Sequence, residues 1–450
     1  MNNNCFIVLP NQLFDNIEYY IQNITNNIFI IEEPHFFSEH IKPNKIKIAY
    51  LRACMKLYYD NLKKKLQNYN IVYIDFSNII KNKYDFLKKY NLFSFELNDY
   101  KLKNKYNQFN LVFNELSSPM FIMNKNDLDL YDRNNPSHSS FYIFVKNKLQ
   151  ILQNIKNQDI YNRKNKRQLI NLNISLNTNY NSYYIEAIEY SNKSIFREHI
   201  GNATLDTLRI YPINSKDAYK HFELFLINKC KYFGDFQDVI QDNNPFLYHS
   251  IISPMLNIGL IEPLKLIQII IKYENKLPLN AYEGFIRQII GWREYMKYLY
   301  QYKYDLLIKS NNFNNSNNLD RTWYNATTGI SILDNEIKKV ITYGYAHHIV
   351  RLMVFLNFMI LNQINPNEIY KWFMEVISID AYDWVMIPNI YSMGYFSKIG
   401  MKRPYLSSSN YLLKMSNYKK DNKWDIIWTN KFRHFVKLNN INFYLRSIKN

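Results

Sequence analysis

The stretch Tyr343-Gly344-Tyr345-Ala346-His347-His348-Ile349-Val350-Arg351-Leu352-Met353 opens a strongly apolar helical pattern in the second half of the chain. Two adjacent histidines begin this pattern. Arg351 follows one turn later on the same face as His347, because residues four apart are neighbours on a helix. A polar cluster at the start of a buried helix is typical of a functional site, although histidines at helix starts also serve as caps.

The helical pattern extends over most of the chain from residue 216 onward. Apolar residues recur at helical spacing, and few alternating β-branched runs interrupt them. The predicted helices are residues 218–231, 254–273, 281–302, 330–343, 346–362 and 366–377. The second half of the chain therefore predicts a mostly α-helical domain.

The first part of the chain alternates short apolar runs with helical stretches. The predicted strands are residues 5–10, 28–32, 71–76, 93–97 and 119–124, and the predicted helices are residues 12–26, 46–67 and 84–90. This alternation indicates a parallel sheet with helices on its faces. The sequence contains no GxGxxG, so a dinucleotide site of the usual Rossmann type is not supported.

A chain of 450 residues is long for one hydrophobic core, and two domains are expected. We predict an α/β domain over residues 1–140 and an all-α domain over residues 216–450. Between them, residues 141–215 are rich in Asn, Lys, Ser and Tyr and predict an interdomain linker. This organisation suits a cofactor held between helices.

The charge balance is strongly basic, with 56 Lys and Arg against 38 Asp and Glu and a net charge of +18. This favours a polyanionic partner, with nucleic acid first, although a Lys-rich composition alone also gives a basic protein. Cys5, Cys54 and Cys230 are far apart, which predicts neither a disulfide framework nor a cysteine metal site. Without a secretion signal or a run of about 20 apolar residues, we expect an intracellular protein with no membrane partner.

Several short motifs occur in a fixed order along nearly the whole chain. They are residues 10–14 (PNQLF), 32–37 (EEPHFF), 51–55 (LRACM), 249–259, 284–294, the histidine stretch, 380–385 (DAYDWV), Pro388-Asn389, Met393 and 402–411. In this order and spacing they resemble the photolyase/cryptochrome superfamily. The resemblance is closest to its iron–sulfur bacterial branch, which contains the prokaryotic (6-4) photolyases.

The resemblance implies a Rossmann-like α/β antenna domain followed by an all-α FAD-binding domain. It also implies light-driven electron transfer from reduced FAD to a pyrimidine lesion that is flipped out of UV-damaged DNA, since a cofactor cannot reach stacked bases. We therefore expect a monomeric DNA photolyase, of the (6-4) kind. The alternatives are a cryptochrome-type blue-light photoreceptor with little repair activity and a flavin-free DNA-binding protein.

The same resemblance implies roles for individual residues around a lesion pocket. His348, and next to it His347, match the paired histidines that protonate a (6-4) lesion, a task that suits imidazole because its pKa lies near neutrality. Tyr405, Tyr411 and Met393 match the walls of that pocket. Exposed basic side chains near these motifs are expected to grip DNA phosphates; they are Lys398, Lys402, Arg403, Lys414, Lys419 and Lys420.

Cofactor contacts and electron carriers are implied in the same way. The flavin set is Ser253, Asn257, Gln288, Arg293, Arg351, Asp380, Asp383 and Asn389. Arginine suits the pyrophosphate because its fork donates two hydrogen bonds, and Asp380 is the first choice for a carboxylate near the flavin ring. The electron carriers are Trp372, Trp384 and Tyr324, with Trp323 as the alternative to Tyr324.

The antenna region corresponds to Glu32, Glu33, Phe36 and Phe37. In this branch the antenna is 6,7-dimethyl-8-ribityllumazine, whose ribityl hydroxyls carboxylates can hold. The branch also carries a [4Fe–4S] cluster, whose cysteines match Gly329–Leu333 and the segment after Tyr418. Neither segment contains a cysteine here, so thiolate ligation is impossible there. We expect no iron–sulfur cluster and no other metal.

Overall fold

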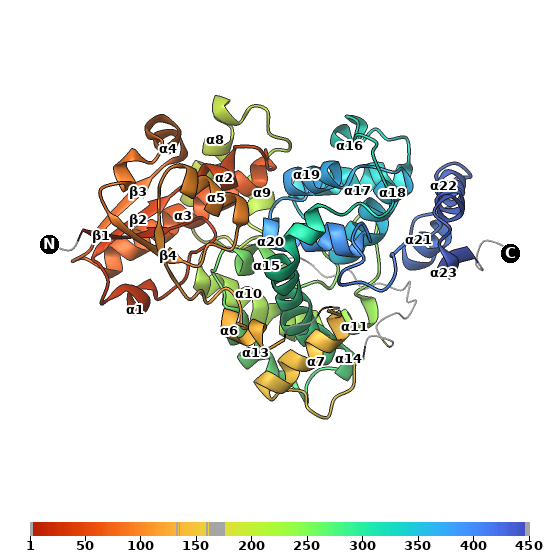
Figure 1. The fold of residues 1–450 in the computed structure, drawn as a ribbon, viewed down its shortest axis with the longest axis horizontal. Coiled ribbons are helices and arrows are strands. Elements are labelled where there is room, and N and C mark those ends of the chain that lie inside the picture. The colour runs from red at the N-terminus through yellow and green to blue at the C-terminus, as the bar shows by residue number, and fades with distance from the viewer. Residues whose placement is uncertain (1–2, 132–133, 135, 159–160, 162–175, 446–450) are drawn as a thin grey trace.

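A computed structural model describes residues 3–131, 134, 136–158, 161 and 176–445. The α/β part lies at one end of the longest axis, and helices fill the rest (Figure 1). The two chain ends lie at opposite ends of this axis. This arrangement agrees with the predicted order of an α/β domain and a helical domain.

The α/β part is built on a five-stranded parallel sheet with the order β3-β2-β1-β4-β5. The strands are β1 Asn4–Val8, β2 Asn27–Ile31, β3 Asn70–Ile74, β4 Asn91–Phe95 and β5 Phe113–Leu116. Helices connect them, including α1 Ile17–Ile21, α3 Lys45–Lys65 and α5 Tyr100–Gln108. Strand order reverses beside β1, and such a reversal is where ligands bind in open parallel sheets.

The last strand differs from the sequence prediction. Residues 119–124 form a loop, whereas β5 lies at Phe113–Leu116. This edge strand buries little, so it lacks the apolar run that marks a central strand. The apolar side chains of Met120 and Met123 are buried instead by the loop, where Glu294 accepts the backbone N–H of Met123 at 3.0 Å.

The predicted linker contributes structure of its own. Helix α7 (His138–Leu149) packs on the helical part, and α8 (Asn181–Ser191) packs along α3. Three of the four buried residues of α8 are spaced three apart, at Tyr184, Ala187 and Tyr190, and an Asn- and Tyr-rich composition hides this helical face. Part of the predicted linker, residues 162–175, lies outside the described residues.

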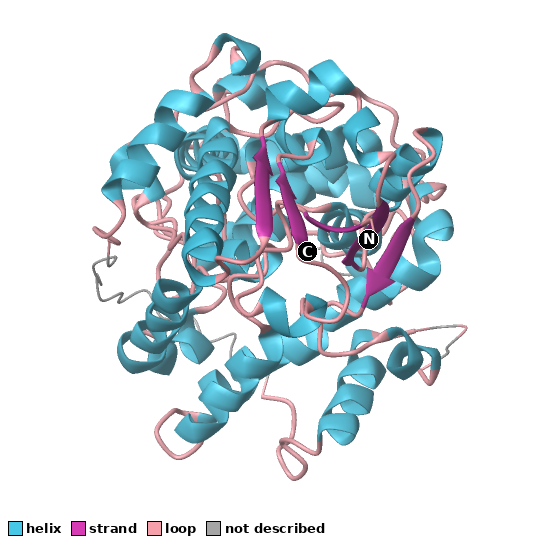
Figure 2. Cartoon of the chain, turned by 90° about the vertical axis from the view of Figure 1, so that its left-hand side faces the viewer, coloured by secondary structure: helices cyan, strands magenta, loops and turns pink. Residues whose placement is uncertain are grey.

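One large apolar core extends from the sheet into the helical part, and Figure 2 views the molecule from its α/β end, with the strands in front of the helical part. Its helices of five or more residues are α10 Ser215–Asn228, α11 Cys230–Phe236, α12 Ser253–Asn257, α13 Pro263–Ile270, α14 Leu279–Ile286, α15 Glu294–Ile308, α17 Ser331–Tyr343, α18 Asn357–Leu361, α19 Pro366–Val376, α20 Asp383–Pro388, α21 Ser409–Met415 and α22 Trp424–Leu438. The predicted helix 254–273 is divided after α12, where Gly259 adopts a positive φ of 85°. No helix in the described part of the chain is long and apolar enough to cross a membrane.

A buried carboxylate joins α8 to the sheet. Glu32, at the end of β2, is fully buried and accepts hydrogen bonds from Arg52 at 2.7 Å, Tyr190 at 2.6 Å, Tyr73 at 2.5 Å and the N–H of Phe76 at 2.8 Å. Its four partners come from four segments of the chain. Such a group stabilises the fold only while its partners are complete.

We expect Glu32→Gln to lower the free energy of unfolding by about 3–5 kcal/mol, because Arg52 and two tyrosine hydroxyls lose a charged acceptor in a dry site. Urea unfolding followed by circular dichroism measures this. Glu186→Gln is the matched control, since Glu186 pairs with the same arginine but is 43 % exposed. We expect the control to cost under about 1 kcal/mol; equal losses in the two variants would contradict the assignment.

Candidate functional site

Residues from separate motifs meet at Asp380, in the segment between α19 and α20. The Arg351 guanidinium donates to both carboxylate oxygens at 2.9 Å, and the Ser253 hydroxyl donates to Oδ2 at 2.6 Å. Asn257 donates to the backbone carbonyl of Asp380 at 2.8 Å, and Arg293 in turn donates to the Asn257 side chain. Five residues of the predicted flavin set are therefore connected.

Three π-helical segments coincide with the predicted motifs. They are η5 Arg287–Arg293, η6 Val350–Leu356 and η7 Asn389–Met393. A π turn contains more residues than an α turn and is frequent at functional sites. These segments contain Arg293 and Arg351 from the connected cluster. They also contain Gln288, Asn389 and Met393, and the Asn389 side chain donates to the carbonyl of Val385 at 2.7 Å.

The first histidine of the pair is buried and stacked. The His347 ring lies parallel to that of His249, with centroids 4.4 Å apart and 12° between the planes. Nδ1 of His347 and Nε2 of His249 are buried without a hydrogen-bond partner in the protein. Burial lowers the pKa of His347 well below its ordinary value and that of His249 to about 3. Both rings are therefore neutral at pH 7.

The second histidine opens the helix that leads into η6. The His348 side chain is exposed, and its ring meets the edge of Trp292 at 5.5 Å. Desolvation by the surrounding protein, followed by the charge of Arg351, lowers the pKa of His348 to about 4. An acid at this position therefore needs a ligand that brings negative charge and raises the pKa again.

Buried donors without a protein partner also gather near the cluster. Nε1 of Trp384 and Nε of Arg293 have none, and the Arg293 guanidinium lies over the Trp384 ring at 4.6 Å. Buried polar groups are normally paired, so unpaired donors at one place indicate a missing polar ligand. A large ligand with phosphate and amide acceptors, such as FAD, fits this set of donors.

The predicted electron carriers do not form a continuous chain of contacting aromatic rings. Trp372 is fully buried and meets Trp323 edge to face at 5.9 Å, with its Nε1 donating to the Trp323 carbonyl at 3.0 Å. Tyr324 is turned to Glu375, to which its hydroxyl donates at 3.1 Å. The Trp384 ring instead contacts the guanidinium of Arg293. Of the two alternatives given by the sequence, Trp323 is the one in contact with Trp372.

The predicted lesion-pocket and DNA residues lie in the last third of the chain. Met393 is buried in η7, whereas Tyr405 and Tyr411 are half-buried. The basic residues assigned to phosphate contact are mostly exposed; the exposed ones are Lys398, Lys402, Lys414, Lys419 and Lys420, while the half-buried Arg403 lies over the Phe443 ring at 4.2 Å. These side chains provide an exposed basic surface in residues 398–420.

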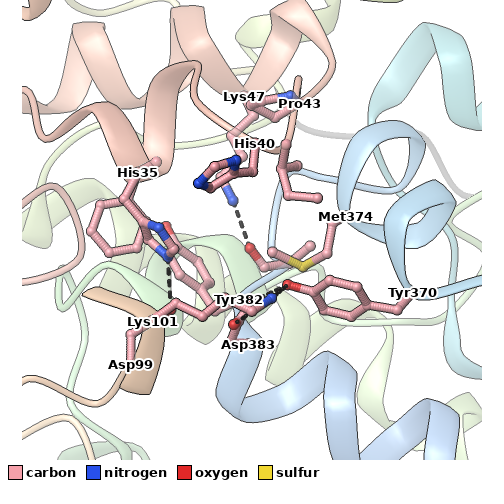
Figure 3. Close-up of a pocket in the computed structure, with 13 residues that line it drawn as sticks. His35, His40, Pro43, Lys47, Asp99, Lys101, Tyr370, Met374, Tyr382 and Asp383 are labelled. Atoms are coloured by element: carbon pink, nitrogen blue, oxygen red, sulfur yellow. Dashed lines mark hydrogen bonds and ion pairs between the residues drawn. The ribbon is translucent and has the colours of Figure 1, made fainter. Parts of the chain in front are cut away.

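Asp383 does not join the cluster around Asp380. It is buried at a pocket between the two domains, where Tyr370 donates to it and Lys101 pairs with it at 3.2 Å (Figure 3). Asp383 begins α20 and therefore turns away from the preceding loop toward the α/β part. The sequence prediction grouped Asp380 and Asp383 as flavin contacts, but the structure separates them.

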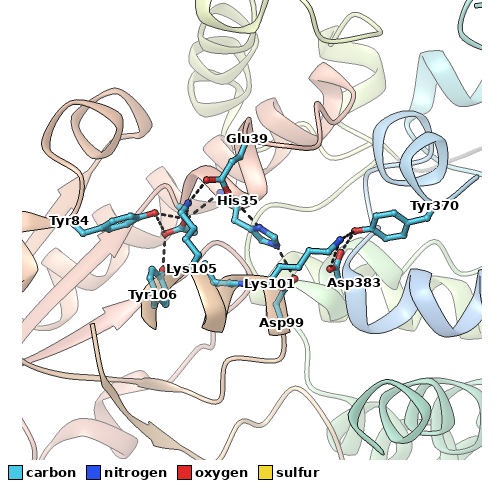
Figure 4. A network of polar contacts seen from close by, with 11 residues as sticks. His35, Glu39, Tyr84, Asp99, Lys101, Lys105, Tyr106, Tyr370 and Asp383 are labelled. Carbon is cyan, nitrogen blue, oxygen red and sulfur yellow. Dashed lines mark hydrogen bonds and ion pairs between the residues drawn. The ribbon is translucent and has the colours of Figure 1, made fainter. Parts of the chain in front are cut away.

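The interface pocket has a volume of about 150 Å³ and is lined by charged groups from both domains. His35 pairs with Asp99 at 2.9 Å (Figure 4). Burial opposes the charge on His35, but Asp99 and then Glu39 outweigh it and raise the pKa of His35 to about 10. Burial lowers the pKa of Lys47 to about 7, against the attraction of Asp380, Asp383 and Asp99.

The predicted antenna carboxylates are occupied by protein groups. Glu33 is fully buried and accepts from the hydroxyls of Tyr84 and Tyr106 at 2.7 and 2.8 Å and from Lys105 at 2.8 Å (Figure 4). Glu32 is equally saturated, and Phe37 is fully buried. Phe36 lines the interface pocket. Neither carboxylate has room for ribityl hydroxyls, so these residues do not fit the lumazine as predicted.

The two segments that match the cluster cysteines lie against each other. The Ser331 hydroxyl donates to Asp421 at 3.2 Å, and Asp421 also accepts the N–H groups of Lys423 and Trp424 at 2.9 Å. Ile332 is fully buried and belongs to the hydrophobic core. Among the described residues, no group of three or more His, Cys, Asp or Glu side chains is arranged to hold a metal ion.

Sequence reasoning missed three residues that contact the site. His249 lies in the motif 249–259, but the sequence did not predict its stacking on His347. Trp292, also within a motif, touches His348. Lys47 reaches the Asp380 segment from the α/β domain, and in the sequence it is one lysine of many. These three residues were missed for one reason. Each contacts a residue that is far away in the sequence, and a local sequence pattern does not reveal such contacts.

A parallel α/β domain beside a helical domain with a buried polar cluster defines a class of two-domain cofactor-binding proteins. A family model described as "Deoxyribodipyrimidine photo-lyase-related protein" matches residues 6–206. The (6-4) photolyase of Agrobacterium fabrum is 37 % identical over 212 residues, which are 46 % of this chain and 42 % of that protein. The chain thus aligns with less than half the length of this relative.

Two further likenesses extend the comparison. The protein R855 of Acanthamoeba polyphaga mimivirus is 52 % identical over 86 residues, 19 % of this chain and 69 % of that protein. The crystal structure of the Synechocystis cryptochrome has the same fold, with a TM-score of 0.64 at 12 % identity over 97 % of this chain and 89 % of that one. Residues 6–206 thus match the photolyase-related family, and the likenesses support the photolyase/cryptochrome superfamily and its bacterial (6-4)-like branch, as expected from the sequence. The likeness to the solved structure confirms the predicted two-domain fold.

The pair of His35 and Asp99 makes folding stability depend on pH. The pKa of His35 rises from 6.5 to about 10 on folding. Its contribution is therefore fully present below pH 6.5 and is lost as the pH rises through 10. We expect the difference in unfolding free energy between the wild type and His35→Gln to shrink from pH 6 to pH 10 by at most about 5 kcal/mol. Urea unfolding across this range measures it, and a constant difference would contradict the pairing; the exposed His434→Gln is the control.

Proposed function

We propose that this protein binds FAD around Asp380 and repairs UV-induced lesions in DNA under light, with (6-4) photoproducts as substrate. The observation that carries the proposal is the convergence of Arg351, Ser253 and Asn257, from two separate motifs, on one buried residue: Arg351 and Ser253 donate to the carboxylate of Asp380 and Asn257 donates to its backbone carbonyl. When bound, reduced FAD supplies a light-driven electron. The similarity to the Agrobacterium (6-4) photolyase supports the choice of substrate class.

The residues of the cluster have distinct tasks in this proposal. Arg351 is fixed by the carbonyl of Ala346 at 2.6 Å and by Asp380, and such a pre-positioned guanidinium is suited to acidic groups of the cofactor. Arg293 has an unpaired Nε and offers a second cation. Asp380 pairs with Arg351 and offsets its charge, so this carboxylate affects how strongly the site attracts an anionic cofactor.

His348 is the proposed proton donor to the lesion. It is exposed, whereas His347 is buried in a stack with His249 and is available only to a ligand inside the site. Because the pKa of His348 is about 4 in the free protein, its protonation requires the nearby negative charge of the cofactor or the DNA phosphates. Exposed lysines in residues 398–420 would bring the DNA backbone to this face.

Neither a lumazine at Glu32 and Glu33 nor an iron–sulfur cluster takes part in the proposed reaction. Protein donors already saturate both carboxylates. The sequence has no cysteine beyond Cys230, so thiolate ligands for a cluster are lacking. The contact between Ser331 and Asp421 supplies a metal-free connection between the two segments concerned.

A cryptochrome-type photoreceptor is the second candidate. The lowered pKa of His348 favours it, because a neutral imidazole is a poor acid for a (6-4) lesion. Both candidates require a bound flavin, and they differ in whether DNA is changed under light.

Repair assays on the purified full-length chain test both. We expect yellow protein, or protein that becomes yellow with added FAD, with flavin absorption and less than about one iron per ten chains, since thiolate ligands are lacking. Blue light should restore oligonucleotides with a (6-4) photoproduct, and not those with a cyclobutane dimer. Flavin binding without any repair would favour the photoreceptor. Failure to bind FAD would exclude both.

His348→Ala should lower the rate of (6-4) repair by at least about 100-fold, which is the usual contribution of a general acid, while FAD stays bound. In the wild type the repair rate should fall as the pH rises, because the imidazole must be protonated. The variant should lose this pH dependence. Repair under single-turnover light gives both quantities, with the exposed His434→Ala as the control; an unchanged rate would remove His348 from the mechanism.

A further inference from the structure

Lys47 is a buried lysine that no part of the proposed repair reaction uses. It lies in the first turn of α3, on the α/β domain, and is 3 % exposed. Its Nζ crosses the domain boundary and donates to the backbone carbonyl of Ala381 at 2.6 Å (Figure 3). The same Nζ lies 4.2 Å from the centre of the Tyr382 ring. A lysine is almost never buried in this way without a specific partner.

Ala381 is the residue next to Asp380, so the contact lies one peptide from the candidate flavin cluster. The helical domain holds Asp380 itself, through Arg351, Ser253 and Asn257. The α/β domain holds the peptide that follows. The segment between α19 and α20 is therefore clamped from both domains.

The beginning of α3 supplies a second contact to the same segment. The backbone N–H of Asn44 donates to the Ser378 hydroxyl at 3.1 Å, and its side chain donates to the Ile341 carbonyl at 2.8 Å. One helix start thus contacts Ser378 and Ala381, on either side of Asp380. Because one hydrogen bond from the start of α3 reaches the Ser378 hydroxyl and another reaches the Ala381 carbonyl, the direction of the Asp380 side chain depends on where α3 lies.

We propose that Lys47 is a positioning residue for the flavin site, which holds the peptide of Ala381 so that Asp380 stays aligned with Arg351 and Ser253. The α/β domain then helps to position the flavin site through the segment that carries Asp380. This inference rests on the proposed binding of FAD around Asp380. The carboxylates that face Lys47 are Asp380, Asp383 and Asp99, and the contact to Ala381 needs only a donor at Nζ and not its charge.

Three variants of the full chain separate positioning from folding. Lys47→Met keeps the length and removes the donor. Lys47→Gln keeps a neutral donor. Lys101→Met is the matched control, because Lys101 contacts Asp383 on the far side of the segment and is 43 % exposed. Titration of apoprotein with FAD, followed by flavin fluorescence, gives the Kd, and thermal melting of the apoprotein gives the Tm.

We expect Lys47→Met to weaken FAD binding about tenfold, which corresponds to the loss of one intramolecular hydrogen bond. Lys47→Gln should stay within about threefold of the wild type, and so should the control, because both keep the contact to Ala381. The apoprotein Tm of Lys47→Met should be equal to or above that of the wild type, since removing a buried ammonium group relieves its desolvation.

Each other outcome overturns the inference. Wild-type affinity in Lys47→Met would remove the role. A parallel loss of Tm and of FAD affinity in both Lys47 variants would reduce Lys47 to a folding contact. If the wild type does not bind FAD, the proposed function itself is wrong. The wild-type titration therefore separates a failure of the proposed function from a failure of the proposed role of Lys47.

Discussion

The ion pair between Arg351 and Asp380 is the constraint on which the organisation of this protein depends. Both partners are largely buried, so neither can lose the other without leaving a charge in a dry environment, at a cost of about 3–5 kcal/mol. The arginine comes from a π-helical segment and the carboxylate from a non-helical connection. Their pairing therefore fixes an irregular helix and an irregular loop at the same place, which two hydrophobic faces alone would not do.

The two charged regions of the molecule have opposite characters. Around His347 and His348 desolvation, followed by the charge of cationic neighbours, lowers the pKa of both imidazoles. Around His35 the neighbours are carboxylates, and the imidazole is charged. The region around His347 and His348 therefore favours a ligand that carries negative charge. The second is satisfied internally and acts to hold the domains together.

The sequence predicts the parts of this structure that hydrophobic patterns and motifs record. Buried strands such as β1 and long helices such as α3 follow from apolar runs and helical spacing. The edge strand β5 buries too little to give a signal, and α8 is hidden by its Asn- and Tyr-rich composition. In the site, the sequence predicts Asp380 because this residue lies in a local motif. It does not predict which way the Asp383 side chain points. That direction depends on Lys101, 282 positions earlier in the chain, and on Tyr370, 13 positions earlier.

The π-helical segments have a consequence for how the chain tolerates change in length. A π turn inside a helix is equivalent to one residue inserted into an α-helix. Deleting one residue from η6 would let the helix close into regular α-helical turns, and everything after the deletion would rotate by about 100° around the helix axis. Arg351 lies within this segment, and the apolar face of α18 follows it. Single-residue deletions at η5, η6 or η7 should therefore be far less tolerated than substitutions at the same positions, since they turn a whole face of the helix away from its partners.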